Sequence, residues 1–146
     1  MTAPAATIDE DIARLRRAAR PLADPPAAPG WNLAKLADVI DPKLPRRSAA
    51  VLVPFVRRDE ALSLLFTRRT AHLARHAGQV SFPGGRWHPE DSSLTATALR
   101  ETQEETSIEP NRVSVAGFLD AYETGTGFAI LPVVALIDEG FSLRPD

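Results

Sequence analysis

A continuous apolar stretch runs over 48–56 and is followed, after the polar residues 57–60, by a second apolar stretch at 61–67. Continuous apolar runs of this length are typical of strands that are buried on both faces. The polar residues between the two stretches have turn composition, so the stretches are predicted to form a hairpin. Further strands are predicted at 113–121 and 128–137, and a short one at 78–82, which ends at a Pro-Gly-Gly turn.

A helix is predicted over 93–106, where a serine is available to cap the first turn. At about 100° per residue, Leu94 and Ala98 fall on one side of this helix. Arg100 flanks a neighbouring arc of roughly 100° that is acidic. The acidic residues of that arc are Glu101, Glu104 and Glu105. One face can therefore pack against a sheet while the adjacent face presents three carboxylates together.

The first part of the chain has a different pattern. Residues 8–19 place apolar side chains at helical spacing, whereas 21–30 are rich in Pro, Ala and Gly and predict a linker or a wrapping arm. A second short helix is predicted within 31–40. We therefore expect an N-terminal helical arm with a Pro-rich linker at 1–46 and one domain at 47–146.

Strands around one strong helix predict an α+β fold or a layered α/β/α arrangement. Hydrophobic residues make up 44% and charged residues 25% of the 146 residues, which is typical of a globular protein. The net charge of -2 argues against a nucleic-acid partner. The chain has no cysteine, which excludes disulfides, thiolate zinc sites and a cysteine nucleophile. Without an apolar run of about 20 residues or a signal pattern, we expect a cytoplasmic protein with no membrane partner.

The acidic arc of the helix has two interpretations. The simpler one is a solvated acidic surface. However, like charges three and four residues apart destabilise a helix, and no basic residue follows in the next turn to relieve them. A hard divalent cation would relieve the repulsion, because Mg2+ prefers oxygen ligands and bridges to substrate phosphates. A glycine loop, 82–85, ends a strand shortly before this helix and lets the backbone approach a ligand or metal.

Together, the glycine loop and the acidic helix resemble the Nudix box. Gly85 matches its glycine, Asp91 stands where its first glutamate belongs, and residues 100–108 (RETQEETSI) match the rest. Asp91 replaces Glu and is separated from Arg100 by eight residues rather than seven. Thr102 replaces an apolar residue, and Ser107 replaces the glycine that ends the helix.

The extra residue before Arg100 resembles the coenzyme A pyrophosphatase branch of the Nudix family. The upstream segment, 65–85, also resembles this branch. Residues 65–70 (LFTRRT) and 76–85 (HAGQVSFPGG) are similar to its signature, and the segment departs from it at Phe66, Thr70 and Ala74. The resemblance covers about 48–137.

The resemblance implies a Nudix-like α/β/α sandwich with a mixed sheet. The family fold places another helix after the last predicted strand, and the chain gives no sign of this C-terminal helix before it ends at Asp146. The resemblance also allows for a homodimer.

The activity implied by the resemblance is metal-dependent hydrolysis of a nucleoside diphosphate-linked small molecule. Coenzyme A or acyl-coenzyme A would be cleaved to 3',5'-ADP and (acyl-)4'-phosphopantetheine. The implied ligands of Mg2+ or Mn2+ are Glu101, Glu104 and Glu105. The implied catalytic residues are Glu101, Glu104 and Arg100, with Arg100 orienting the glutamates. The implied substrate-binding residues are Arg68, Arg69, Gly84 and Gly85.

Several alternatives remain at this point. Other substrates are ADP-ribose, NADH and nucleoside triphosphates, and a non-catalytic nucleotide-binding module is a further alternative. The arginines Arg68, Arg69 and Arg75 fit phosphate binding and a solvated strand end equally well. Tyr122 and Glu123 lie where the family often adds substrate contacts.

Overall fold

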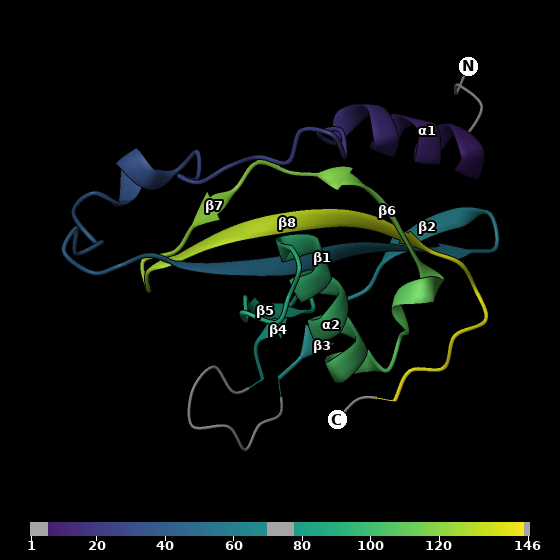
Figure 1. Ribbon diagram of the computed structural model, residues 1–146. Coiled ribbons are helices and arrows are strands. Elements are labelled where there is room, and N and C mark those ends of the chain that lie inside the picture. The colour runs from purple at the N-terminus through teal and green to yellow at the C-terminus, as the bar shows by residue number, and fades with distance from the viewer. Residues whose placement is uncertain (1–5, 70–77, 145–146) are drawn as a thin grey trace.

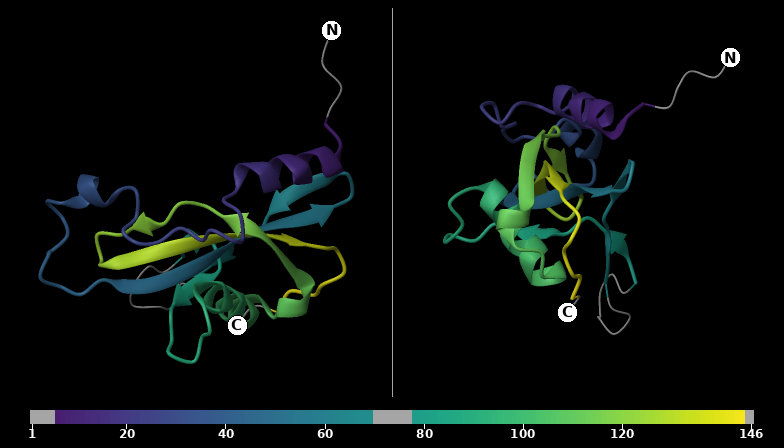
Figure 2. Two further views of the ribbon diagram at one scale, coloured as in Figure 1. Left: turned by 45° about the horizontal axis from the view of Figure 1, so that its top comes forward. Right: turned by 90° about the vertical axis from the view of Figure 1, so that its right-hand side faces the viewer.

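The computed structural model describes residues 6–69 and 78–144 of the chain. Within them, a six-stranded mixed sheet lies between two helices, α1 (Ile8–Ala18) on one face and α2 (Leu94–Thr106) on the other (Figure 1). Figure 2 shows the same three layers from two further directions. The predicted α+β architecture with a mixed sheet is confirmed.

The sheet consists of β1 (Arg47–Arg58), β2 (Ala61–Leu64), β5 (Gly84–Arg86), β6 (Val113–Phe118), β7 (Tyr122–Glu123) and β8 (Phe128–Ile137). Its main order is β2-β1-β8-β6, while β5 pairs with β1 and β7 pairs with β8. The two long central strands, β1 and β8, run parallel, and the other pairs run antiparallel. A separate two-stranded sheet joins β3 (Thr67–Arg68) to β4 (Val80–Ser81).

Alternate residues of β1 and β8 face the two helices. On the α2 side the core includes Ala50, Leu52, Val133, Ala135 and Ala98. On the α1 side it includes Ala19, Val53 and Val134, with Leu15 packed against them. Because both faces are covered, the central strands have continuous apolar sequences rather than alternating ones. Full burial of each large aliphatic side chain contributes about 1.5–3 kcal/mol.

The N-terminal segment wraps the sheet from the α1 side. Helix α1 begins with a capping box, in which Thr7 accepts from the backbone of Glu10 and the Glu10 side chain accepts from the backbone of Thr7. After the helix, Arg20 pairs with Phe118 of β6 through backbone hydrogen bonds. The chain then follows β7 and forms the short 3-10 helix η1 (Leu33–Leu36).

Several elements are shorter than the sequence predicts. The stretch 61–67 contains β2 and then, after a break, the start of β3, and 78–82 contains only the two residues of β4. The stretch 113–121 ends as a strand at Phe118, and 31–40 contains η1 and turns instead of a regular α-helix. A second 3-10 helix, η2 (Pro110–Arg112), connects α2 to β6. No helix in the described part of the chain is long and apolar enough to cross a membrane.

Candidate functional site

Both ends of α2 are defined by serines. The helix begins where the hydroxyl of Ser93 accepts a hydrogen bond from the backbone N–H of Ala96, 3.1 Å away. It ends at Thr106, after which Ser107 adopts the left-handed conformation with φ of 63°. The N–H of Ser107 donates to the carbonyl of Gln103 at 2.8 Å. Ser107 therefore takes the conformation that glycine favours at this position of the motif.

The face of α2 that contacts the sheet is small and partly polar. Its buried residues are Thr97, Ala98, Thr102 and Thr106. Thr102, where the motif has an apolar residue, is fully buried, and its hydroxyl donates to the carbonyl of Ala98 at 2.7 Å. Because the hydroxyl is satisfied within the helix, a threonine can occupy an apolar position without a free polar group.

Glu101 lies against the backbone of β5. A Cβ atom placed on Gly85 would overlap the carboxyl carbon and both carboxyl oxygens of Glu101. Gly85 has no positive φ, so the glycine is required here for space rather than for backbone conformation. The glycine loop and the acidic helix, which are separated in the sequence, therefore meet through this carboxylate.

Arg100 connects the glutamates to the loop that precedes the helix. Its Nε and Nη2 donate to the two carboxyl oxygens of Asp91 at 2.9 and 3.0 Å, a bidentate pairing. Its Nη1 donates to Glu101 at 3.0 Å and to Glu104 at 3.3 Å, and Nη2 also reaches the carbonyl of Arg86 at 3.0 Å. The hydrogen bonds with Asp91 raise the pKa of Arg100 above its usual value. Arg100 thus fixes two of the three carboxylates relative to β5.

Asp91 is held by more than its arginine partner. It accepts a hydrogen bond from the backbone N–H of His88 at 3.1 Å and another from the hydroxyl of Thr97 at 2.9 Å. The hydrogen bonds from Arg100 are the main reason that the pKa of Asp91 lies well below its usual value, although burial opposes this. Asp91 therefore remains a carboxylate throughout the neutral range, and Thr97 is a contact that the sequence patterns did not reveal.

Glu105 is held by the upstream segment. The hydroxyl of Thr67 in β3 lies 3.2 Å from its carboxyl oxygen, and this hydroxyl and the backbone of Gly84 both act to lower the pKa of Glu105. Partial burial is the main reason that the pKa of Glu105 is raised, and the negative charge of Glu101 adds to the effect. Two carboxylates, Glu101 and Glu105, are therefore close enough to repel each other beside the Gly84–Gly85 backbone.

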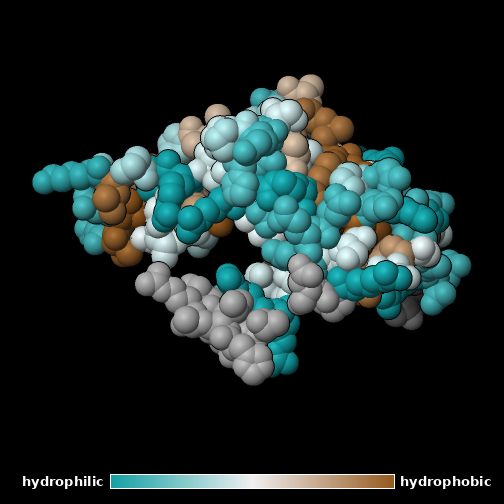
Figure 3. All heavy atoms as spheres, turned by 60° about the horizontal axis from the view of Figure 1, so that its bottom comes forward, coloured by the Kyte–Doolittle hydropathy of each residue, from teal (hydrophilic) through white to brown (hydrophobic). Residues whose placement is uncertain are grey.

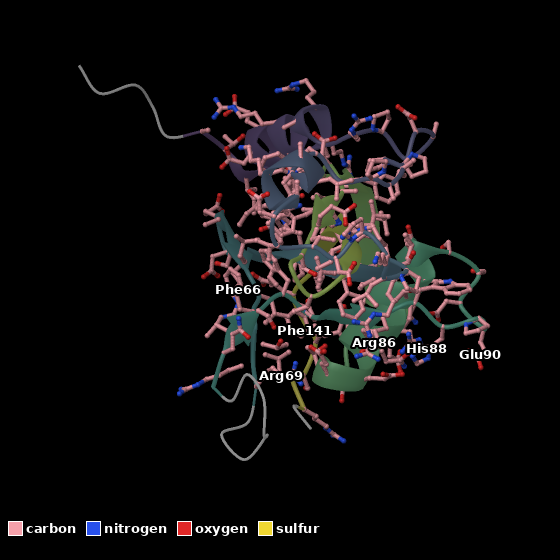
Figure 4. The ribbon with its side chains drawn as sticks, turned by 90° about the vertical axis from the view of Figure 1, so that its left-hand side faces the viewer. Phe66, Arg69, Arg86, His88, Glu90 and Phe141 are labelled. Carbon is pink, nitrogen blue, oxygen red and sulfur yellow. The ribbon has the colours of Figure 1, made fainter. Side chains whose placement is uncertain are left out.

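The predicted substrate arginines are placed differently from one another. The charge of Arg69 acts on Glu105, so Arg69 lies on the side of the acidic helix. Arg68 is exposed on β3 and its guanidinium lies near Gly78. Arg75 and the rest of the branch signature between 70 and 77 lie outside the described residues. Figure 4 shows Arg69 and Phe66 on one side of the view and Arg86, His88 and Glu90 on the other.

The donor set on α2 has the chemistry of a divalent-cation site. Three carboxylates share one helix face next to the glycine backbone, and the face seen in Figure 3 is mostly hydrophilic. Among the described residues, no three acidic or histidine side chains already converge into a complete set of metal ligands. Glu101 and Glu104 turn towards Arg100, and Glu105 turns towards Thr67. The oxygen-only donors and their repulsion fit Mg2+ or Mn2+, with side-chain rotation needed to bring the carboxylates together.

Glu123, one of the suggested substrate contacts, is fully buried in the structure. Its carboxylate accepts from the backbone N–H of Gly30 at 2.7 Å and forms an ion pair with Arg46. Asn32 adds two hydrogen bonds to the backbone of Glu123, at 2.7 and 2.8 Å. These contacts fasten the N-terminal segment to β7, whereas Tyr122 is half-exposed beside Trp31.

Comparison with known proteins supports the motif. A family model described as the NUDIX domain matches residues 45–141. Proteins named "Uncharacterized Nudix hydrolase NudL" from Salmonella paratyphi B and Salmonella enteritidis are each 52% identical over 101 residues. The match covers 69% of this chain and 52% of each relative. The chain therefore spans about half the length of the curated relatives it matches.

Solved structures show the same fold at low sequence identity. A Nudix hydrolase from M. smegmatis, RenU, gives a TM-score of 0.58 at 18% identity, over 70% of this chain and 66% of that chain. An Ap4A hydrolase binary complex from C. elegans gives 0.56 at 21% identity, over 68% and 72%. The NUDIX domain of Shewanella oneidensis NrtR, complexed with ADP ribose, gives 0.50 at 23% identity, over 75% and 72%.

Proposed function

Because the chain belongs to the Nudix hydrolase family, we propose that it is a metal-dependent pyrophosphohydrolase of nucleoside diphosphate-linked substrates, with coenzyme A or acyl-coenzyme A as its substrate. The observation that carries the proposal is the meeting of Glu101, Glu105 and the Gly84–Gly85 backbone. Such a cluster of hard oxygen donors beside a close-approach glycine strand suits a cation and a diphosphate.

In this proposal Glu101, Glu104 and Glu105 hold Mg2+ or Mn2+. When bound there, the cation would neutralise the diphosphate charge and lower the pKa of the attacking water. Arg100 orients Glu101 and Glu104 through the hydrogen bonds described above. One glutamate of the acidic helix, or a carboxylate outside the motif, accepts the proton of the attacking water. The water oxygen bonds to one phosphorus of the diphosphate, and the bridging P–O bond breaks to release 3',5'-ADP and 4'-phosphopantetheine.

The support for coenzyme A comes from the upstream segment. Thr67 lies in the stretch that resembles the branch signature, and its hydroxyl contacts Glu105 of the acidic helix. Arg69, two residues later, places a positive charge near the same carboxylate. In the proposal Arg68, Arg69, Gly84 and Gly85 contact the substrate, because guanidinium groups pair well with phosphate oxygens and the glycines admit close approach.

The decisive experiment is a substrate panel. Coenzyme A, dephospho-coenzyme A, ADP-ribose and ATP are each incubated with the chain, with and without Mg2+, and products are separated and identified. We expect metal-dependent release of 3',5'-ADP from coenzyme A, with the highest kcat/KM in the panel. Faster cleavage of ADP-ribose would refute the coenzyme A assignment and leave the broader pyrophosphohydrolase activity.

The role of the carboxylates is tested with Glu101→Gln and Glu104→Gln. Loss of charge stabilisation in the transition state predicts a kcat lower by orders of magnitude with the thermal unfolding midpoint largely kept. Glu109→Gln is the matched control, because Glu109 is exposed and lies outside α2. Normal turnover in both site variants would show that the acidic face is only a solvated surface.

A further inference from the structure

Two exposed arginines share one aromatic ring near the start of the central strands. The guanidinium carbon of Arg47 lies 4.1 Å from the ring centre of Phe128, and that of Arg86 lies 5.3 Å from the same centre. Both distances are within the range of cation–π contacts, and both arginines are exposed while Phe128 is half-buried. The ring therefore holds two like charges close together at the surface.

The strand register explains why these three side chains meet. Arg47 of β1 is paired with Phe128 of β8, and Ala49, two residues along β1, is paired with Arg86 of β5. Paired residues, and residues two apart on one strand, point to the same face of a sheet. Val134, an even-numbered residue of β8 like Phe128, belongs to the core on the α1 side. The two arginines thus lie on the face of the sheet opposite to α2.

The charges of this pair are not neutralised by neighbours within the described residues. Neither Arg47 nor Arg86 has a carboxylate oxygen within the 4.0 Å of an ion pair in that part of the chain. Arg47 donates to the carbonyl of Thr126 at 3.1 Å, which orders its side chain without adding negative charge. The neighbouring Arg46 is already paired with Glu123. Two guanidiniums on one ring, neither with an ion-pair partner among the described residues, favour a doubly charged phosphate group, which each can bind through two hydrogen bonds.

The location of the pair connects it to the acidic helix. The Glu101 carboxylate lies against Gly85 on the α2 face, and the side chain of the next residue, Arg86, points to the opposite face. Strand β5 pairs only with β1 among the described residues, so its other side is an edge. A substrate that crosses this edge can place a diphosphate at Glu101 and a second phosphate at Arg86.

We propose that Arg47 and Arg86, held on Phe128, bind a phosphomonoester of the substrate. This inference rests on the proposed function, and in coenzyme A the only phosphomonoester is the 3'-phosphate. It assigns recognition of that group to Arg47 and Arg86, and leaves Arg69 for the diphosphate beside Glu105. The pair is a specificity element, because a substrate without the phosphomonoester leaves both guanidiniums without their partner.

The test measures equilibrium binding of 3',5'-ADP and 5'-AMP to the chain without a divalent metal, so that it is independent of turnover. We expect 3',5'-ADP to bind at least about tenfold more tightly than 5'-AMP, as befits hydrogen bonds to a charged group. Arg47→Gln and Arg86→Gln should each bring the ratio of the two dissociation constants close to one. Arg112→Gln, which removes the same charge from an exposed position in η2, should leave the ratio unchanged.

The outcomes separate this inference from the proposed function. The phosphomonoester site would be overturned if the ratio of the two dissociation constants is unchanged in both site variants. It would also be overturned if the unaltered chain binds the two nucleotides equally well, and both results hold even if coenzyme A is cleaved. A ratio that collapses in both variants supports the site even if no substrate is cleaved. Because both arginines are exposed and neither is part of an ion pair among the described residues, the variants are expected to fold, which circular dichroism would check.

Discussion

The adjacent glycines of β5 should respond differently to the same substitution. At Gly84, a Cβ would lie 2.6 Å from the Cα of Val51 and would also overlap the carbonyl oxygen of Ala50. Both are backbone atoms of the central strand β1 and cannot move without breaking the sheet. At Gly85, the overlapping atoms all belong to the end of the Glu101 side chain, which can rotate away. Gly84→Ala therefore perturbs the fold, whereas Gly85→Ala perturbs the site.

The expected magnitudes follow from these contacts. Forcing a methyl group into a packed strand costs typically about 1–3 kcal/mol and occasionally more, and the rigid neighbours of Gly84 place this site at the upper end, about 3 kcal/mol. Gly85→Ala breaks the partly exposed contact between Glu101 and Arg100, which contributes about 0–1 kcal/mol to stability. Part of this loss is offset because alanine loses less backbone entropy on folding than glycine does. The free energy of unfolding should therefore fall by about 3 kcal/mol in one variant and by less than about 1 kcal/mol in the other.

The measurements are urea unfolding followed by circular dichroism and Mn2+ binding followed by calorimetry. Gly85→Ala should keep its unfolding midpoint but bind Mn2+ at least about tenfold more weakly, because Glu101 is displaced from its place on β5. Equal destabilisation of the two variants would refute the distinction between rigid and movable neighbours. Unchanged Mn2+ binding in Gly85→Ala would refute the inference that the Glu101 carboxylate binds the metal beside Gly85.

Three further predictions concern contacts around the sheet and helix. Thr67→Val should weaken Mn2+ binding because Glu105 loses a hydrogen bond, whereas Thr67→Ser should retain binding; equal calorimetric affinities of the two variants would contradict this. Asp91 has a folded-state pKa below its unfolded value of about 3.9, so its stabilising contribution is present above that pH and is lost as the pH falls below it. Urea midpoints measured from pH 6 to pH 2 should therefore fall more in the unaltered chain than in Asp91→Asn, and parallel curves would count against the link to Arg100. Glu123→Gln should lower the free energy of unfolding by about 3 kcal/mol, because it breaks a buried ion pair, and a change near zero in urea titration would disprove that contribution.

The central strands could be predicted closely because their signal is local. Residues 48–56 and 128–137 are covered on both faces, so nearly every side chain is apolar, and the structure extends these stretches by little or nothing. The acidic helix was also predicted to within one residue, since its serine cap and its periodicity lie within one stretch. By contrast, 61–67 has one apolar pattern but two strands, because Leu65 hydrogen-bonds back to Pro54 and the chain then leaves the main sheet.

Contacts between residues that are far apart in the sequence left no local pattern from which they could be predicted. Thr67 and Glu105 are 38 positions apart, and Arg46 and Glu123 are 77 positions apart. Each is an ordinary polar residue in its own segment, and only the tertiary fold brings the partners together. The same limit applies to Arg86, whose place beside Phe128 depends on the register of three strands. Sequence patterns could therefore locate the acidic helix but not the residues that hold and surround it.

The hydrogen bonds of Arg100 show how the structure accommodates two departures from the Nudix motif. An aspartate has a shorter side chain than the glutamate it replaces, and the extra residue before Arg100 lengthens the loop that carries it. In the structure Asp91 still accepts hydrogen bonds from both Nε and Nη2 of Arg100. The hydroxyl of Thr97 and the backbone N–H of His88 donate to it as well. Nη1 is consequently left to reach Glu101 and Glu104. A planar group with donors on three nitrogens can make all these contacts at once, which the single ammonium of a lysine cannot do. The loop insertion and the shorter acid are thus compatible with the same orientation of the glutamates, because both changes act on the side of the guanidinium that faces away from them.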